Sequence, residues 1–237
     1  MKRSDRSPIV FLLDVDNTLL DNDRIAQDLR DHLEQVFGLD ACTRYCVILE
    51  DLRRELGYAD FLGALQRYRL ERLHDPRLLS MSSFLVDYPF AERLYPKALE
   101  VITYLHAFGP VAILSDGDAV FQPRKVVRSG LWRAVEGRVL IYIHKEEMLD
   151  DVESNYPAEH YVFVDDKPRL LAAVKQVWKN RVMTVFARQG HYAHDPVALR
   201  TYPPSDVSIQ RISDLLEFKE FRVREMSGSP EVQKDVP

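Results

Sequence analysis

The chain has 237 residues, of which 46% are hydrophobic and 29% charged, the composition of a globular protein that can bury a full core without disulfides or a structural metal. Its net charge of −5 gives no general attraction to nucleic acid or to an anionic membrane, so an anionic substrate needs a local site. The two cysteines, Cys42 and Cys46, are too few for a disulfide framework, and we expect them to pack in a helix interface. The apolar run 9–13 is too short for a signal-peptide core or a membrane span, which favours a cytoplasmic protein.

Short apolar runs alternate with helical patterns along most of the chain. Buried strands are expected at 9–14, 110–115, 138–143, 160–165 and 182–187. Helices are expected at 96–108, 123–129, 146–153 and 168–178, and a weak strand and helix at 207–218 close the pattern. This alternation predicts an α/β fold with a parallel sheet, helices on both faces and right-handed crossovers.

The segment 22–93 interrupts this alternation because its periodicity is helical throughout. We therefore expect a small α-helical cap domain at 22–93, inserted after the first strand of a core domain formed by 1–21 and 94–225. The last residues, 226–237, are polar, and we expect a flexible tail there.

Polar residues follow the buried strands at the point where each strand ends. In strand order they are Asp14 and Asp16, then Ser115, Asp116 and Gly117, then Lys145, then Asp165 and Asp166. The carboxyl ends of parallel strands meet at one edge of the sheet, where open α/β sheets bind ligands. Clustered carboxylates repel one another, and Mg²⁺ with its oxygen ligands relieves this repulsion where phosphate is also bound.

These residue types suit phosphoryl transfer. Asp14 can attack phosphorus as a carboxylate nucleophile and form an aspartyl-phosphate. Asp16 can protonate the leaving alcohol and then deprotonate the water that cleaves the intermediate. Ser115 can donate a hydrogen bond to a phosphate oxygen, and Lys145 can neutralise both the nucleophile and the transferred group.

Four segments in order, FLLDVDNTLL, VAILSDGD, HKEEM and YVFVDDK, resemble the four motifs of the haloacid dehalogenase (HAD) superfamily of phosphohydrolases. The resemblance covers 9–20 and 95–187, and it implies a Rossmann-like core with a helical cap and Mg²⁺ as the cofactor. It also implies roles for individual residues. In motif one, Asp14 is the nucleophile, Asp16 is the general acid/base and a metal ligand through its carbonyl, and Thr18 supports the loop. Ser115 with Asp116 and Gly117 forms the phosphate site, Lys145 is the motif-three lysine, Asp166 is the usual Mg²⁺ ligand and Asp165 is the adjacent acid. The division of labour between Asp165 and Asp166 stays open.

Two lysines follow motif two and compete for the motif-three role. Lys125 falls inside the helix expected at 123–129, where a solvated position is the simpler interpretation. Lys145 precedes the acidic pair with only a short helix between, so Lys145 is the predicted catalytic lysine.

The residue at position 16 separates subfamilies of the superfamily. The dehalogenases that give it its name attack carbon and lack a carboxylate there, because a halide leaves without a proton. A phosphonatase would use a lysine of the cap to form an imine, and no lysine lies between Asn17 and Pro96. Both observations favour phosphate ester chemistry.

The expected cap is rich in arginine, and some of these side chains could reach an anionic substrate. For each of them a solvated helix face is the simpler interpretation: Arg24, Arg30, Arg44, Arg53, Arg54, Arg67, Arg69 and Arg72. Tyr58, Phe61 and Tyr68 could line a pocket, although at helical spacing a core position is the simpler interpretation. Arg188, His191 and His194 follow the fifth strand at the same edge of the sheet, where a surface loop is the simpler interpretation.

The sequence therefore predicts a Mg²⁺-dependent phosphomonoesterase for a small phosphorylated metabolite, with no nucleic-acid or membrane partner, as a monomer or homodimer. Two alternatives stay open. The first is a phosphotransferase or mutase with the same motifs, and the second is a HAD-like binding or regulatory protein with little catalysis.

Overall fold

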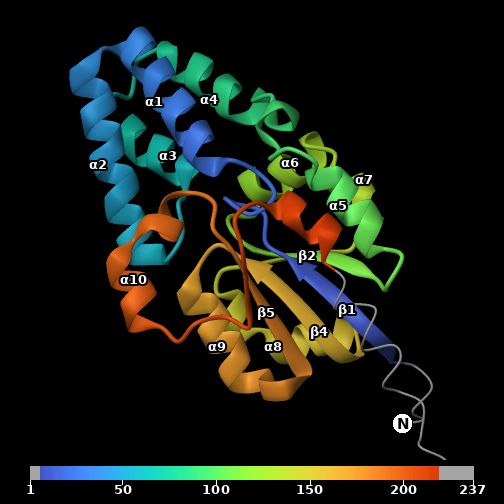
Figure 1. Cartoon of the computed structure of the whole chain (residues 1–237). Coiled ribbons are helices and arrows are strands. Elements are labelled where there is room, and N and C mark those ends of the chain that lie inside the picture. The colour runs from blue at the N-terminus through green and yellow to red at the C-terminus, as the bar shows by residue number, and fades with distance from the viewer. Residues whose placement is uncertain (1–5, 219–237) are drawn as a thin grey trace, which may run out of the picture.

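The computed structural model describes residues 6–218, and its elements follow the predicted alternation of strands and helices (Figure 1). Six strands form one parallel sheet in the order β3-β2-β1-β4-β5-β6. They are β1 (Ser7–Leu13), β2 (Val111–Asp116), β3 (Val139–Tyr142), β4 (Ala158–Asp165), β5 (Val182–Ala187) and β6 (Val207–Ile209). The predicted α/β fold is confirmed.

Strand β1 is central and buried on both sides. Successive side chains of a strand point to opposite faces. Phe11 and Leu13 belong to one core cluster, and Val10 and Leu12 belong to the other. A strand covered on both faces needs an unbroken apolar run, which is why the sequence here is not alternating.

Helices cover both faces of the sheet. Helices α8 (Leu149–Asn155) and α9 (Pro168–Trp178) pack on the face that carries Val10 and Leu12. The opposite cluster takes in α5 (Ala98–Leu105), α7 (Leu131–Ala134) and the 3₁₀ helix η5 (Ile212–Glu217). The remaining elements of this part are α6 (Phe121–Arg128), α10 (Pro196–Thr201), η2 (Lys145–Glu147), η3 (Lys179–Arg181) and η4 (His191–His194).

Residues 22–93, called the insert from here on, are helical, as predicted. They form α1 (Asn22–Phe37), α2 (Leu39–Leu56), α3 (Phe61–Glu71), α4 (Arg77–Asp87) and η1 (Phe90–Arg93). Asp21 accepts a hydrogen bond from the first turn of α1, and Asp60 accepts one from the first turn of α3. Each of these two helices is therefore capped by the aspartate that precedes it. The insert lies beyond the carboxyl ends of β1, β4 and β5 (Figure 1).

Several boundaries differ from the prediction. Helix α6 begins at Phe121, before the proline expected to start it, because the Asp118 carboxylate accepts hydrogen bonds from the nitrogens of Val120 (2.8 Å) and Phe121 (2.6 Å). The helix expected at 96–108 is shortened to α5, since Lys97 takes a left-handed φ of 65° just before it.

Two further predicted helices differ in type from the observed ones. The helix expected at 146–153 is divided into the 3₁₀ helix η2 and the α-helix α8, and the helix expected at the end of 207–218 is the 3₁₀ helix η5. The expected tail, 226–237, lies outside the described residues. Within 6–218, no helix combines the length and the apolarity that a membrane crossing requires.

Candidate active site

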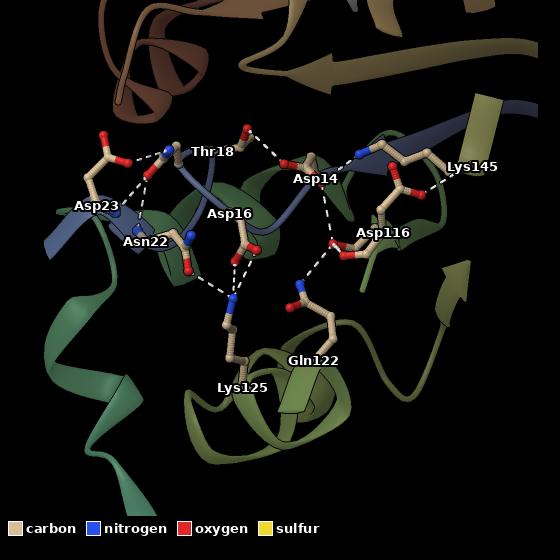
Figure 2. Close-up of polar contacts among 11 residues, drawn as sticks. Asp14, Asp16, Thr18, Asn22, Asp23, Asp116, Gln122, Lys125 and Lys145 are labelled. Atoms are coloured by element: carbon tan, nitrogen blue, oxygen red, sulfur yellow. Dashed lines mark hydrogen bonds and ion pairs between the residues drawn. The ribbon is translucent and has the colours of Figure 1, made fainter. Parts of the chain in front are cut away.

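The predicted site residues converge at the carboxyl edge of the three central strands (Figure 2). The chain runs from β1 outward to β2 and β3, then returns to place β4 on the other side of β1. Such a change of direction opens a crevice at the strand ends. Asp14 follows β1, Ser115 lies in β2, and Asp165 ends β4.

Asp14 is buried and held by three side chains. Its Oδ1 atom accepts a hydrogen bond from Lys145 Nζ at 2.5 Å and a longer one from Ser115 Oγ at 3.4 Å. Its Oδ2 atom accepts one from Thr18 Oγ1 at 3.5 Å. The structure therefore brings the predicted nucleophile together with the predicted lysine, serine and threonine.

Lys145 is fully enclosed, and its ammonium has a carboxylate on each side. Nζ lies 2.5 Å from Asp14 Oδ1 and 2.7 Å from Asp165 Oδ2, and it also donates to the carbonyl of Leu114 at 3.2 Å. Burial alone would lower the pKa of Lys145, but the negative charges of Asp14, Asp165 and Asp116 outweigh it and raise that pKa. Lys145 thus stays a cation beside Asp14.

Three carboxylates face one another at the centre of the site. Oxygens of Asp14, Asp165 and Asp166 lie within 4.8 Å of one another. Burial and the neighbouring charge of Asp165 raise the pKa of Asp166 well above the ordinary value, and burial likewise raises the pKa of Asp165. A divalent cation with oxygen ligands would balance these buried negative charges and relieve the repulsion between them.

Asp165 and Asp166 differ in the hydrogen bonds and ion pairs that their carboxylates form within residues 6–218. Asp165 Oδ1 accepts a hydrogen bond from the Lys167 nitrogen at 2.8 Å, and its Oδ2 pairs with Lys145. Both oxygens of Asp166 are buried without a hydrogen bond from residues 6–218. An orphaned buried carboxylate of this kind fits a direct metal ligand.

Asp16 stands apart from this acidic group, and its contacts correct the prediction for Lys125. Lys125 is buried, and its Nζ donates to both oxygens of Asp16, at 2.7 and 2.9 Å, and to Asn22 Oδ1 at 2.8 Å (Figure 2). The expected solvated position is wrong because Lys125 finds a charge partner, Asp16 of the loop after β1, and a neutral acceptor, Asn22 of α1, which offset the cost of burying its ammonium.

The loop after β1 is tightened by Asn17. The nitrogens of Leu19 and Leu20 both donate to the Val15 carbonyl at 2.9 Å, and Asn17 takes a left-handed φ of 58°, which asparagine tolerates better than most residues. Asn17 Oδ1 then accepts hydrogen bonds from the nitrogens of Asn22 and Asp23. The loop thus links the nucleophile strand directly to the first helix of the insert.

Motif two presents a serine, an acid and a glycine. Ser115 Oγ accepts a hydrogen bond from Gln122 Nε2 at 2.9 Å. The Asp116 carboxylate accepts one from the Lys145 nitrogen at 2.7 Å, and burial raises the pKa of Asp116 to about 6. A Cβ atom on Gly117 would lie 2.6 Å from Gln122 Cβ, so the close packing of α6 needs glycine there.

Gln122 and Lys125 were not predicted as site residues. They lie three residues apart in α6, so both face the site. That spacing after motif two was the available signal. It is weak because charged and amide side chains at such spacing usually mark a solvated face.

A small cavity of about 70 Å³ lies between the insert and the core. Its core lining consists of Asp16, Asn17, Asp116, Gly117, Gln122, Lys167, His191 and Tyr192, and its insert lining of Asn22, Arg53, Gly57, Tyr58 and Ala59. The cavity therefore combines groups from both parts of the molecule.

Most insert arginines that form ion pairs lie on solvated faces, as predicted. Exposed pairs join Arg44 to Glu71, Arg54 to Asp51 and Arg67 to Glu55. Arg53 also lines the cavity. Phe61 and Tyr68 are buried in the core, as predicted, whereas the core interpretation is wrong for Tyr58, which lines the cavity.

The loop after β5 and the cysteines complete the comparison with the sequence. His191 is exposed, as expected of a surface loop, and it also contacts the insert: its Nδ1 lies 2.7 Å from Asp23 Oδ1. Cys42 and Cys46 are free thiols on α2 that contact the core cluster, as predicted.

Solved structures share this fold and size. A haloacid dehalogenase-like hydrolase from Burkholderia xenovorans LB400 is 63% identical to this chain, with a TM-score of 0.86, over 90% of this chain and 99% of its own. The HAD-hydrolase YfnB from Bacillus subtilis, bound to magnesium, is 17% identical with a TM-score of 0.58, over 90% of this chain and 98% of its own. L-2-haloacid dehalogenase from Xanthobacter autotrophicus, with chloropropionic acid covalently bound, is 19% identical with a TM-score of 0.57, over 89% of this chain and 97% of its own.

No protein-family model and no curated protein matches the chain. The two distant structures establish the common fold alone. The Burkholderia protein establishes the family, since its identity extends over nearly its whole length. The chain thus belongs to the haloacid dehalogenase-like hydrolases.

Proposed function

We propose that the chain is a Mg²⁺-dependent phosphomonoesterase that acts on a small phosphorylated metabolite through an aspartyl-phosphate on Asp14. The competing reaction is cleavage of a carbon–halogen bond, because an L-2-haloacid dehalogenase shares the fold. Both reactions begin with a carboxylate nucleophile, so Asp14 alone does not separate them.

The observation that carries the proposal is the second carboxylate, Asp16. It lines the cavity two residues beyond the nucleophile, and Lys125 holds both of its oxygens. An alkoxide leaving group needs a proton as its bond breaks, whereas a halide leaves without one. Asp16 therefore has a task in ester hydrolysis and none in dehalogenation.

The reaction follows from the contacts of Asp14. An Asp14 oxygen attacks phosphorus, the bond from phosphorus to the alcohol oxygen breaks, and Asp16 gives that oxygen a proton. Water then attacks the same phosphorus, Asp16 takes a proton from it, and inorganic phosphate leaves as the Asp14 carboxylate is restored. Lys145 and Ser115, which contact Asp14, would bind the phosphoryl oxygens.

Asp14, Asp165 and Asp166 would hold the Mg²⁺ ion, and the partnerless oxygens of Asp166 are the strongest support for this. The bound ion would neutralise the carboxylates and the phosphoryl oxygens. Asp16 would join the ligands through its backbone carbonyl, since its carboxylate is engaged by Lys125.

The insert would act as the cap of this site. It contributes Asn22, Arg53 and Tyr58 to the cavity lining. A cover of this kind excludes water from the reacting groups and contacts the leaving group.

The test is an assay of the purified protein on a panel of phosphomonoesters and, in parallel, on 2-haloacids, each with Mg²⁺ and with EDTA. We expect phosphate release that needs Mg²⁺ and no halide release. Asp14→Asn should lower kcat by at least about 10³-fold, because it removes the nucleophile.

Asp51→Asn is the matched control, since it changes an exposed aspartate of the insert that pairs with Arg54. It should leave kcat unchanged. Halide release from a 2-haloacid, or full phosphatase turnover by Asp14→Asn, would show the proposal to be wrong.

A further inference from the structure

Lys125 is a buried cation that the proposed reaction does not use, although it contacts one of the reacting groups. It lies on α6, is 1% exposed, and touches neither Asp14 nor the acidic group of Asp165 and Asp166 by any hydrogen bond or ion pair among residues 6–218. A lysine is rarely buried this deeply without a specific task.

We infer that Lys125 is a positioning residue that fixes the carboxylate of Asp16 in its proton-transfer geometry and ties that geometry to the seating of the insert. The inference deepens the proposed phosphomonoesterase function and rests on it. Lys125 acts only through Asp16, so its role differs from that of Lys145, which contacts the nucleophile itself.

The first support is the bidentate contact. Lys125 Nζ lies 2.7 Å from one oxygen of Asp16 and 2.9 Å from the other, so the carboxylate cannot rotate without losing a charge-assisted hydrogen bond. Asp16 is 24% exposed, whereas Asp14 is 3% exposed. A partly exposed aspartate has free rotamers, and Lys125 removes that freedom.

The second support is that both parts of the molecule hold the ammonium. The core contributes Asp16 and the ring of Phe121, whose centroid lies 5.2 Å from Nζ. The insert contributes Asn22 Oδ1 at 2.8 Å and the ring of Phe61, whose centroid lies 5.9 Å away. The position of Nζ, and through it that of Asp16, therefore depends on the insert resting against α6.

The third support is that proton transfer tolerates little change in the distance between the Asp16 carboxylate and the leaving oxygen. Proton transfer needs the acid within hydrogen-bond reach of the leaving oxygen, and a displacement of about 1 Å lowers rates by about 100-fold. Asp16 has no hydrogen-bond donor to its carboxylate within 6–218 other than Lys125. Loss of that contact leaves nothing else to aim the carboxylate.

The test is a double-mutant cycle on turnover with Lys125→Met and Asp16→Asn. Methionine has a similar length and an apolar chain, and can occupy the space between the rings of Phe61 and Phe121. We expect Lys125→Met to lower kcat by about 10- to 100-fold with little change in KM, because Lys125 positions an acid and does not bind substrate. In the Asp16→Asn background the same change should have no further effect.

The leaving group provides a readout that a merely structural role would not move. An alkyl phosphate needs the proton from Asp16 more than p-nitrophenyl phosphate does, because p-nitrophenolate is the better leaving group. The loss caused by Lys125→Met should therefore be larger for the alkyl ester. Lys125→Gln, which keeps a neutral donor, should fall between the wild type and Lys125→Met, and it serves as the second variant if the methionine protein folds poorly.

Lys175→Met is the matched control. Lys175, on α9, also forms a lysine–aspartate pair, with Asp206 at 2.7 Å. It is not part of the cavity lining. It should keep the wild-type kcat. Equal losses from Lys125→Met in the wild-type and Asp16→Asn backgrounds, or equal losses on both esters, would overturn the inference while the phosphatase function stood. Absence of wild-type turnover on every ester would instead overturn the proposed function, and the inference with it.

Discussion

Asp166 is the single residue whose surroundings best fit a divalent cation at this site. Its two oxygens are buried and accept no hydrogen bond from residues 6–218. An acid whose pKa is raised on folding stabilises the fold at low pH and loses that contribution as the pH rises. In the metal-free protein, Asp166 should therefore contribute less to the stability of the fold at neutral pH than at low pH.

We predict that Asp166→Asn raises the free energy of unfolding of the metal-free protein at neutral pH by about 1–3 kcal/mol. The gain should vanish below about pH 4, the ordinary range of an aspartate, and grow as the pH rises from there. The measurement is urea unfolding in EDTA across this pH range.

The same variant should abolish stabilisation by Mg²⁺. For the wild type, Mg²⁺ at about a hundredfold excess over its Kd should add about 2.7 kcal/mol. Asp51→Asn should keep that increment. A wild-type protein whose unfolding midpoint did not respond to Mg²⁺ would contradict the assigned metal site.

At this scale the sequence predicted that Asp14, Lys145 and Asp165 would lie together, because Asp14 and Asp165 stand at strand ends and Lys145 follows β3 closely. Their chemical roles stay predictions. It did not predict the burial of Lys125. That burial depends on Asp16 and Asn22, more than a hundred residues earlier in the chain, and on the insert resting against α6. A helix pattern alone contains none of these contacts.

Among the elements, helix α2 meets the core at its carboxyl end. The helix is followed by its C-cap residue, Gly57, which has a left-handed φ of 83°. A Cβ atom on Gly57 would lie 2.7 Å from Cε1 of His144. His144 directly precedes Lys145. The end of an insert helix is thus packed against the residue that precedes Lys145.

Gly38, between α1 and α2, offers a matched comparison. Its φ is 91°, but a Cβ atom there would have no neighbour within 4 Å. We predict that Gly38→Ala and Gly57→Ala each lower the free energy of unfolding by about 1–3 kcal/mol through backbone strain. Only Gly57→Ala should also change KM or kcat, because it displaces His144 and the cavity wall. Equal kinetics for both variants would argue against this contact.

The elements were predictable where composition and period agree, as in β5 and α9, whose observed bounds match the expected ones. They were less predictable where a side chain decides the start. Helix α6 begins at Phe121 because Asp118 caps it, and a proline later in the first turn was a misleading marker.

Over the whole molecule, the insert and the sheet share one apolar core. The contact is formed by three nearly inaccessible rings, those of Phe61 and Phe90 in the insert and of Phe121 in α6. The ring centroid of Phe61 lies 5.2 Å from that of Phe121, and the centroid of Phe90 lies 5.5 Å from it. The sequence predicted that 22–93 would be helical and inserted. The place where it docks depends on this aromatic contact, which no local pattern indicates.

We predict that the protein unfolds in one cooperative transition. Far-UV circular dichroism, dominated by the helices, and the fluorescence of the tryptophans, which lie outside the insert at Trp132 and Trp178, should give the same midpoint. Phe61→Ala should lower the free energy of unfolding by about 3–5 kcal/mol and shift both signals together. Leu79→Ala, at a site that is 76% exposed, is the control. Two separate midpoints would contradict a shared core.

The strand order has a consequence for the protein as it is being made. β1 is translated first, yet its partners β2 and β4 begin only at residues 111 and 158. At roughly 5–20 residues per second, about 5–20 s pass between the end of β1 and the start of β2. During that time the ribosome delivers the four helices of the insert, which can form from local contacts. The apolar segment 9–13 therefore has no strand partner during this time, and an exposed segment of this kind is prone to pair with a second chain.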